Sequence, residues 1–174
     1  KEFPINVNEN MNENSVTDDS HWLVASVNVP GAHGEHALAP EELLDSTGKK
    51  ISRDELAGKT IGFYFSAHWC PPCRAFTPNL VKFRDSNKDD FEVVFVSSDK
   101  SPDAQMGYMK ETGMKWYTLP HRSSEANALN QKFGVRGIPA LIIVSPDGET
   151  VTKNGRGDVS SNPGGAIKAW TKSS

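Results

Sequence analysis

Cysteine is scarce in this chain: its 174 residues include only two, Cys70 and Cys73. A small domain held by disulfides carries several bridges that close large loops, whereas a bridge between these two residues would close a very short one. Two thiols also fall short of the four ligands typical of a structural zinc site. The pair is therefore a poor structural staple, and another use for it has to be sought.

Long hydrophobic runs and an excess of positive charge are also missing. The longest apolar runs, Val93–Val96 and Ala140–Val144, have the length of strands, far below the roughly 20 residues of a membrane helix. The 19 Lys and Arg residues are outnumbered by 22 Asp and Glu, so no surplus charge exists to neutralise a phosphate backbone. These absences exclude a membrane span and make nucleic acid an unsuitable main partner.

The first part of the chain differs in composition from the rest. Asparagine and acidic residues dominate its first 20 positions, with almost nothing apolar to bury. We therefore expect an N-terminal extension or linker over residues 1–36, with one short strand at His21–Val29, and a single domain over residues 37–174. We expect the protein to be a monomer.

The rest of the chain alternates between strand-like and helix-like patterns. In chain order the sequence predicts two short extended pieces within Leu43–Ser52, a strand at Lys59–Ser66, a helix after Cys73 kinked at Pro78, a strand at Phe91–Val96, a helix from Pro102 toward Lys110, a helix at Ser124–Phe133, a strand at Ala140–Ser145, its hairpin partner at Glu149–Lys153, and a last helix ending near Trp170. This order predicts an α/β fold with a parallel part followed by an antiparallel hairpin.

The two cysteines lie between a predicted strand and a predicted helix, in the run Trp69-Cys70-Pro71-Pro72-Cys73-Arg74. Unpaired amides and the positive end of the dipole at a helix start stabilise a thiolate and lower its pKa. Cys70 is therefore the candidate nucleophile. Cys73, one turn further on and less exposed, is the candidate resolving thiol.

Three other uses of the pair compete with redox chemistry. Zinc would need further ligands, for which His68 and His121 are the candidates, but the proline pair and the strand-to-helix context favour redox chemistry. Covalent haem attachment would need a histidine where Arg74 stands. A pair of inert buried thiols stays open as an alternative.

A second feature lies more than sixty residues downstream, at Gly137-Ile138-Pro139. A proline just before a buried strand is a candidate for a cis peptide bond, which only X-Pro bonds form cheaply. Together with the cysteine motif, with Thr77-Pro78 and with the segments at 91–99 and 116–120, this run resembles the thioredoxin superfamily. The resemblance is strongest to its tryparedoxin and nucleoredoxin branch, and it covers about Leu43 to Trp170.

The resemblance implies a thioredoxin fold, in which a central mixed sheet is flanked by helices and the dithiol starts a helix opposite a cis-proline loop. It further implies that Ile138 offers backbone groups to an extended substrate. The residues that would shape the surrounding substrate-binding surface are Trp69, Pro71, Pro72 and Pro139. No metal and no organic cofactor is expected, since the Cys70–Cys73 pair itself carries the electrons.

Two positions depart from thioredoxin itself. Where thioredoxin has a buried aspartate, this chain has Tyr64, so proton transfer from Cys73 would need another group or water. His68, next to the motif, is a candidate for tuning Cys70 through its charge, or is simply a solvent-facing side chain. We expect Arg156-Gly157-Asp158 to form a turn, and Trp116 to belong to the core.

The sequence thus predicts a thiol-disulfide oxidoreductase, with the reductase direction favoured by the resemblance. Its partners would be client disulfides and an upstream thiol donor. The alternative is a redox-regulated binding module of the same fold that does not turn over. The polar N-terminal segment resembles a stretch left after leader cleavage, so an exported, periplasmic protein is expected in preference to a cytoplasmic one.

Overall fold

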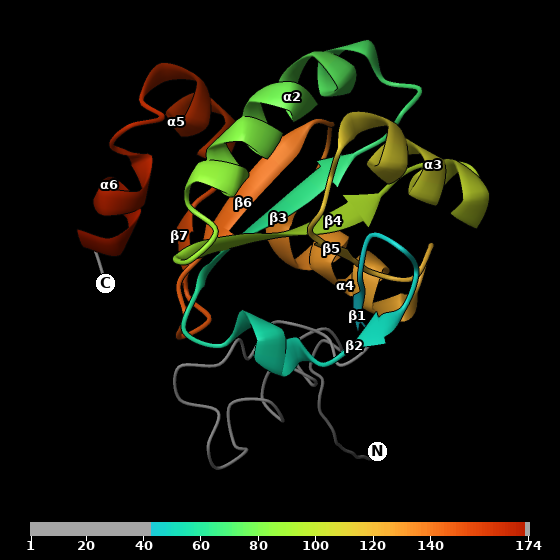
Figure 1. Ribbon diagram of the computed structural model, residues 1–174, viewed down its shortest axis with the longest axis horizontal. Coiled ribbons are helices and arrows are strands. Elements are labelled where there is room, and N and C mark those ends of the chain that lie inside the picture. Colours follow the sequence, from blue (N-terminus) through green and yellow to red (C-terminus); the bar gives the residue numbers. More distant parts are fainter. Residues whose placement is uncertain (1–42, 173–174) are drawn as a thin grey trace, which may run out of the picture.

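A mixed sheet carries the fold, and β3 (Thr60–Ser66) lies in its interior (Figure 1). The structure is a computed structural model that describes residues 43–172. Within these residues the strand order is β2-β1-β5-β4-β3-β6-β7. The other strands are β1 (Leu43–Leu44), β2 (Lys50–Ile51), β4 (Phe91–Ser97), β5 (Tyr117–Thr118), β6 (Ala140–Val144) and β7 (Thr150–Thr152).

The pairing of β3 explains why the sheet is mixed. β3 runs parallel to β4, with Thr60 opposite Phe91, and antiparallel to β6, with Ile61 opposite Val144. The helix between β3 and β4 provides the crossover that parallel strands require, whereas β6 and β7 are joined by a tight hairpin. The parallel part and the C-terminal hairpin predicted from the sequence are confirmed.

Six helical segments accompany the sheet. They are η1 (Arg53–Leu56), α2 (Pro71–Ser86), α3 (Pro102–Thr112), α4 (Ser124–Phe133), α5 (Gly155–Ser161) and α6 (Ala166–Lys172) within the described residues. The Ser101 and Ser123 side chains accept hydrogen bonds from the amides three residues on, which caps α3 and α4 where the sequence predicted that they begin. No described helix is both long enough and apolar enough to cross a membrane.

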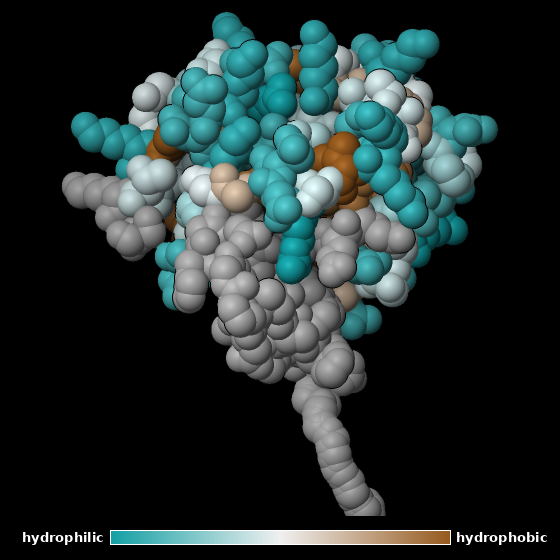
Figure 2. Space-filling model, turned by 60° about the horizontal axis from the view of Figure 1, so that its bottom comes forward, coloured by the Kyte–Doolittle hydropathy of each residue, from teal (hydrophilic) through white to brown (hydrophobic). Residues whose placement is uncertain are grey.

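Two hydrophobic clusters fill the two faces of the sheet. Side chains alternate along each strand, so Tyr64 faces one cluster and its neighbours Phe63 and Phe65 face the other. Helices α2, α3, α5 and α6 cover the Tyr64 face, and η1 and α4 cover the opposite face. Viewed from the bottom of Figure 1, the described surface is mostly hydrophilic with small hydrophobic areas (Figure 2).

Some elements differ from the sequence prediction. The Arg156-Gly157-Asp158 run lies inside α5, so the predicted turn is wrong. The sequence patterns do not predict strand β5 or the short helix η1. Helix α2 starts at Pro71 and continues through Pro78 to Ser86. The predicted extension over 1–36, with its strand at His21–Val29, lies outside the described residues.

Candidate active site

The two cysteines form a disulfide at the end of β3 and the start of α2. Cys70 is the N-cap residue of the helix, with extended backbone angles, and Cys73 is in its first turn. The sequence predicted Cys70 to be the exposed member, but its side chain is only 4% exposed, against 0% for Cys73. The solvent-accessible part of the pair is therefore the small exposed area of Cys70.

The two intervening prolines change the electrostatics of this helix start. Pro71 and Pro72 occupy the first helical positions and have no amide hydrogen. The Arg74 amide is also engaged, because it donates to the Cys70 carbonyl oxygen at 3.1 Å. Of the amides in the first turn, that of Cys73 is therefore the one left to face the Cys70 sulfur. The Arg74 guanidinium adds a full positive charge nearby and donates to the carbonyl oxygen of His68.

A cis-proline loop faces the disulfide. The Ile138–Pro139 peptide bond is cis, as predicted from the sequence. The carbonyl oxygen of Ile138 lies 3.8 Å from the Cys70 sulfur, and Ile138 packs against the buried cluster of Ala67, Cys70 and Cys73. Ile138 is half-buried and Pro139 is buried. The structure thus brings the cysteine motif and the proline motif together, although they are separated by more than sixty residues.

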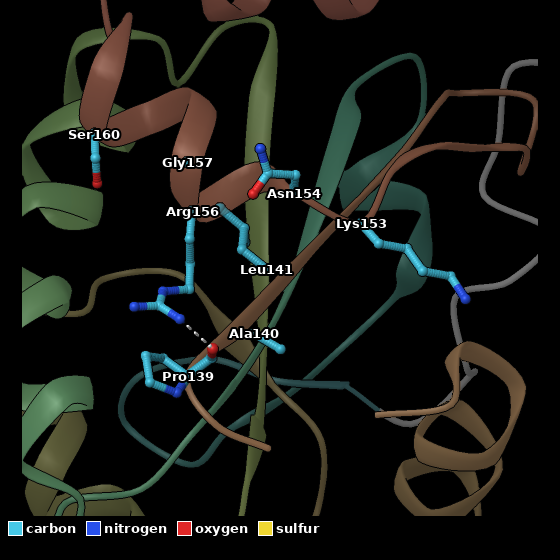
Figure 3. Close-up of a pocket in the computed structure, with 8 residues that line it drawn as sticks. All are labelled: Pro139, Ala140, Leu141, Lys153, Asn154, Arg156, Gly157 and Ser160. Carbon is cyan, nitrogen blue, oxygen red and sulfur yellow. Dashed lines mark hydrogen bonds between the residues drawn. The ribbon is translucent and has the colours of Figure 1, made fainter. Parts of the chain in front are cut away.

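Arg156 of α5 fixes this loop from the side, a role that the sequence did not suggest. Its guanidinium donates to the carbonyl oxygen of Pro139 at 3.1 Å (Figure 3) and lies 5.8 Å from the ring centre of Phe76 in α2. Arg156 and Pro139 both line a cavity of about 330 Å³. Lys153 also lines this cavity, and its side chain points away from Arg156 (Figure 3). Arg156 therefore links α5, the cis-proline loop and α2.

The loop after β4 supports the other side of the motif. The buried Asp99 carboxylate accepts a hydrogen bond from the His68 amide at 2.8 Å and another from the Ser97 hydroxyl at 2.7 Å. The Trp69 indole donates to the carbonyl oxygen of Ser98 at 3.0 Å, while its ring is 52% exposed. The two residues before Cys70 are therefore held by main-chain and carboxylate groups of the same loop.

The His68 side chain points to the outer edge of the site. Its Nε2 lies 3.1 Å from the Glu111 carboxylate, and the two side chains are 45% and 63% exposed. Its ring meets Tyr108 edge-on at 5.3 Å. The His68 side chain is thus exposed at the edge of the site and contacts Glu111 and Tyr108, and a role in tuning Cys70 through charge stays a prediction.

A buried chain of hydroxyl groups lies beneath Cys73. The Thr77 hydroxyl lies 2.8 Å from the Cys73 carbonyl oxygen and 2.7 Å from each of the Tyr64 and Tyr108 hydroxyls. Because a hydroxyl has one hydrogen, Thr77 donates to Cys73 and accepts from both tyrosines. The Ser66 hydroxyl, 2.9 Å from Tyr108, then donates to it. The group that stands in place of an aspartate is thus tied to a neutral network.

Tyr64→Phe should reveal this burial through the pH dependence of stability. Burial raises the pKa of Tyr64 above its ordinary value of about 10. Below about pH 10 the folded and the unfolded protein both keep the Tyr64 proton. Above it the unfolded chain releases the proton first, so the unfolding free energy falls by up to about 1.4 kcal/mol per pH unit. Near neutral pH, Tyr64→Phe should lower the unfolding free energy by about 1 kcal/mol, because it removes the hydrogen bond to Thr77.

We expect the difference between the parent and Tyr64→Phe to shrink by about 1 kcal/mol between about pH 9 and about pH 11, measured by urea denaturation. Ser66→Ala is the matched control, because it removes a bond from the same network without removing the Tyr64 hydroxyl. Its stability difference should stay constant across this range. A constant difference for Tyr64→Phe would contradict the assignment.

The structure also bears on the zinc alternative. Residues 43–172 contain no group of three or more His, Cys, Asp or Glu side chains that could hold a metal ion. His121, a candidate zinc ligand, instead places Nε2 2.7 Å from the Asp99 carbonyl oxygen.

The site residues missed from the sequence are Asp99, Tyr108 and Arg156, each hydrogen-bonded to a residue far away in the chain.

Comparison with known proteins agrees with this geometry. A family model described as thioredoxin-like matches residues 58–150. The chain is 41% identical to nucleoredoxin from Bos taurus over 121 residues, which is 67% of this chain and 27% of that protein. It is 44% identical to probable nucleoredoxin 1 from Arabidopsis thaliana over 117 residues, which is 66% of this chain and 20% of that protein. The chain therefore spans about a quarter of the length of these curated relatives.

Solved structures match a larger share of their own length. A thioredoxin from Wuchereria bancrofti is 43% identical, with 79% of this chain and 98% of that chain covered and a TM-score of 0.67. Tryparedoxin II from C. fasciculata is 36% identical, with 78% and 92% covered and a TM-score of 0.69. The fold, the Cys70–Cys73 pair and these similarities lead to one conclusion: the chain belongs to the thioredoxin-like family of oxidoreductases.

Proposed function

We propose that the protein is a thiol-disulfide reductase in which Cys70 is the nucleophile and Cys73 the resolving thiol. The observation that carries this proposal is the position of the pair: Cys70 is the N-cap residue of α2 and its sulfur lies 3.8 Å from the Ile138 carbonyl oxygen. Cys73 is fully buried behind it. A client disulfide can therefore approach Cys70 but not Cys73.

The reaction is a two-step exchange. In the reduced protein the Cys70 thiolate attacks one sulfur of the client disulfide, which forms a mixed disulfide and releases one client thiolate that takes up a proton. Cys73 then loses its proton and attacks the Cys70 sulfur. This closes the Cys70–Cys73 disulfide and releases the second client thiolate. The client gains two electrons and two protons, which an upstream thiol donor returns to the pair in the next cycle.

The surroundings of Cys70 support its role as the thiolate. The Cys73 amide at the positive end of α2 and the nearby Arg74 guanidinium both favour a negative charge on the Cys70 sulfur. Both sulfurs belong to one buried apolar cluster, so burial alone does not distinguish them. The helix start and the Arg74 charge, which act at Cys70, are what support Cys70 as the nucleophile and Cys73 as the resolving thiol.

The surface around Cys70 supports an extended client segment. Ile138 presents a carbonyl group beside the sulfur, and the Trp69 ring is the exposed large hydrophobic side chain of the described residues. Pro71 and Pro72 are also exposed. We propose that backbone groups of the client pair with Ile138, while its apolar side chains lie on Trp69 and on the exposed Pro71 and Pro72. Pro139 is buried and would shape this surface from below.

The proposal is tested by trapping the intermediate with Cys73→Ser. Without the resolving thiol, the mixed disulfide formed at Cys70 should accumulate. When the reduced variant is mixed with insulin as the probe, we expect a covalent adduct of one protein with one insulin molecule on non-reducing gels, and its loss on adding excess dithiothreitol. Mass spectrometry should place the bond at Cys70.

The double variant Cys70→Ser, Cys73→Ser is the control and should give no adduct. A redox-regulated binding module would behave differently. In that case Cys73→Ser would form only non-covalent, stoichiometric complexes, and the parent protein would show no turnover of insulin with dithiothreitol as donor. That result would reject the reductase in favour of the binding module.

A further inference from the structure

A polar pocket next to the redox loop, the segment 67–70 between β3 and α2, is not used by the reaction described above. It is a cavity of about 300 Å³ between the end of β4 and the face of α4. Its lining residues are Ser97, Ser98, Arg122, Ala126, Asn127 and Asn130. These side chains offer hydroxyl and amide groups and one positive charge, and none of them is a carboxylate.

Hydrogen bonds connect this pocket to the nucleophile. Ser98, which lines it, accepts the Trp69 indole hydrogen at 3.0 Å through its carbonyl oxygen, and Trp69 directly precedes Cys70. His121, next to Arg122, contacts the carbonyl oxygen of Asp99 at 2.7 Å. A client seated on Trp69 therefore has the pocket as its neighbour.

The backbone at Arg122 is unusual in this chain. Its φ of 54° makes it the non-glycine residue with a left-handed conformation in the part of the chain that the structure describes. Side chains other than glycine, asparagine and aspartate rarely adopt this region, and such residues cluster at functional sites. The arginine is exposed at the pocket, and residues 43–172 supply no carboxylate within salt-bridge distance of its guanidinium.

The one buried acid nearby does not cancel this charge at the pocket. The Asp99 carboxylate is directed to the redox loop, where it accepts from the His68 amide and from the Ser97 hydroxyl. The Asn130 amide donates to the Ala126 carbonyl oxygen at 3.3 Å, which fixes its side chain along α4. Among the described residues, the pocket thus presents an unpaired cation and hydrogen-bonding groups to an incoming chain.

We propose that this pocket is a specificity subsite that binds an acidic side chain of the client, with Arg122 as the residue that recognises it. The inference rests on the reductase function proposed above. It adds that clients with Glu or Asp close to the attacked cysteine are reduced faster than neutral ones. Ile138 would pair with the client backbone, an apolar client side chain would lie on Trp69, and the carboxylate would then reach Arg122.

The test uses short synthetic peptides with one internal disulfide. Each peptide carries one test residue, Glu, Gln or Lys, at one position near its first cysteine. The set covers each of these positions in turn. For the parent protein we expect kcat/KM to be about fivefold higher for Glu than for Gln at one or more of these positions, as one partly exposed ion pair can provide. The preference should shrink when the ionic strength is raised to about 0.5 M.

Variants at Arg122 make the test specific. Arg122→Gln should bring the Glu to Gln ratio of kcat/KM close to one, Arg122→Lys should keep part of it, and Arg122→Glu should favour the Lys peptide. Lys132→Gln is the matched control, because it removes one exposed positive charge from α4 away from the pocket and should preserve the ratio. Circular dichroism should show that each variant is folded.

Three outcomes would overturn the proposal. The parent protein could reduce Glu and Gln peptides at equal rates at every position, the preference could survive in Arg122→Gln, or Lys132→Gln could remove it as fully as Arg122→Gln does. If the parent reduces none of the peptides, the reductase function itself fails and this inference fails with it. Reduction without a charge preference rejects the subsite alone.

Discussion

Cys70→Ser should lower the rate of catalysed insulin reduction by a factor on the order of a thousand or more, to that of dithiothreitol alone. A serine hydroxyl at this position remains protonated near neutral pH, so it cannot begin the exchange. The buried Cys73 cannot replace it, because its side chain is 0% exposed and a client sulfur has no path to it. The measurement is the turbidity of precipitating insulin chains at a fixed dithiothreitol concentration.

The fold should survive this substitution. Serine is close to cysteine in size, and the lost disulfide closes a loop of sequence separation 3, which restrains the unfolded chain little. Far-UV circular dichroism and the thermal midpoint therefore serve as controls. Full insulin reduction by a folded Cys70→Ser protein would show that Cys70 is not the nucleophile and would reject the proposed mechanism.

Trp116→Ala should lower the unfolding free energy by about 3–5 kcal/mol, a large part of the stability of a domain of this size. Trp116 is 0% exposed and packs edge-on against Tyr64, with ring centres 6.4 Å apart. Its removal leaves a large cavity between the sheet and its helices. Because its indole nitrogen has no hydrogen-bond partner within residues 43–172, the loss arises from packing. Urea denaturation followed by circular dichroism measures it.

Trp69→Ala is the matched control, since it makes the same change at a side chain that is 52% exposed. Loss of its hydrogen bond to Ser98 and of a partly exposed ring should change stability by about 1 kcal/mol or less. Its effect should instead fall on client reduction. Equal destabilisation by the two substitutions would show that Trp116 does not belong to the core.

The sequence predicted those elements whose signals are local. The start of α3 could be predicted because Ser101, followed by a helix-forming segment, satisfies a free amide by itself. α4 could be predicted because apolar residues recur at helical spacing within Ser124–Phe133. β5, by contrast, consists of Tyr117 and Thr118 alone, and it exists because both β4 and β1 pair with it. Such pairing joins distant parts of the chain, so no short pattern announces it.

Helix α5 shows a second reason for a missed element. Its sequence begins Gly155-Arg156-Gly157, and glycine is a poor helix former, so the run favoured a turn. The helix is instead stabilised by close packing on β6: a Cβ atom at Gly155 would come within 2.8 Å of the Leu141 carbonyl oxygen. The glycine that weakens the helix locally is the one that lets it approach the sheet.

The residues of the candidate site also fall into two groups, those that a local run of sequence reveals and those that only distant contacts reveal. The cysteine motif and Ile138-Pro139 could be found because each is a short, distinctive run. Asp99 and Arg156 could not, because each acts through a hydrogen bond to a residue 31 or 17 positions away. Nothing in the sequence around an aspartate after a strand, or an arginine between two glycines, shows which main-chain group it will meet.

The way the redox loop is supported has a consequence for how such a protein can diversify. The dithiol is attached to β3 and α2, while the groups around it come from the separate loops at 97–99, 120–123 and 136–139. Changes confined to one of these loops leave the Cys70–Cys73 pair on β3 and α2 in place. Under the proposed reductase function, the surroundings of the dithiol can therefore vary loop by loop while the reactive pair keeps its place in the fold.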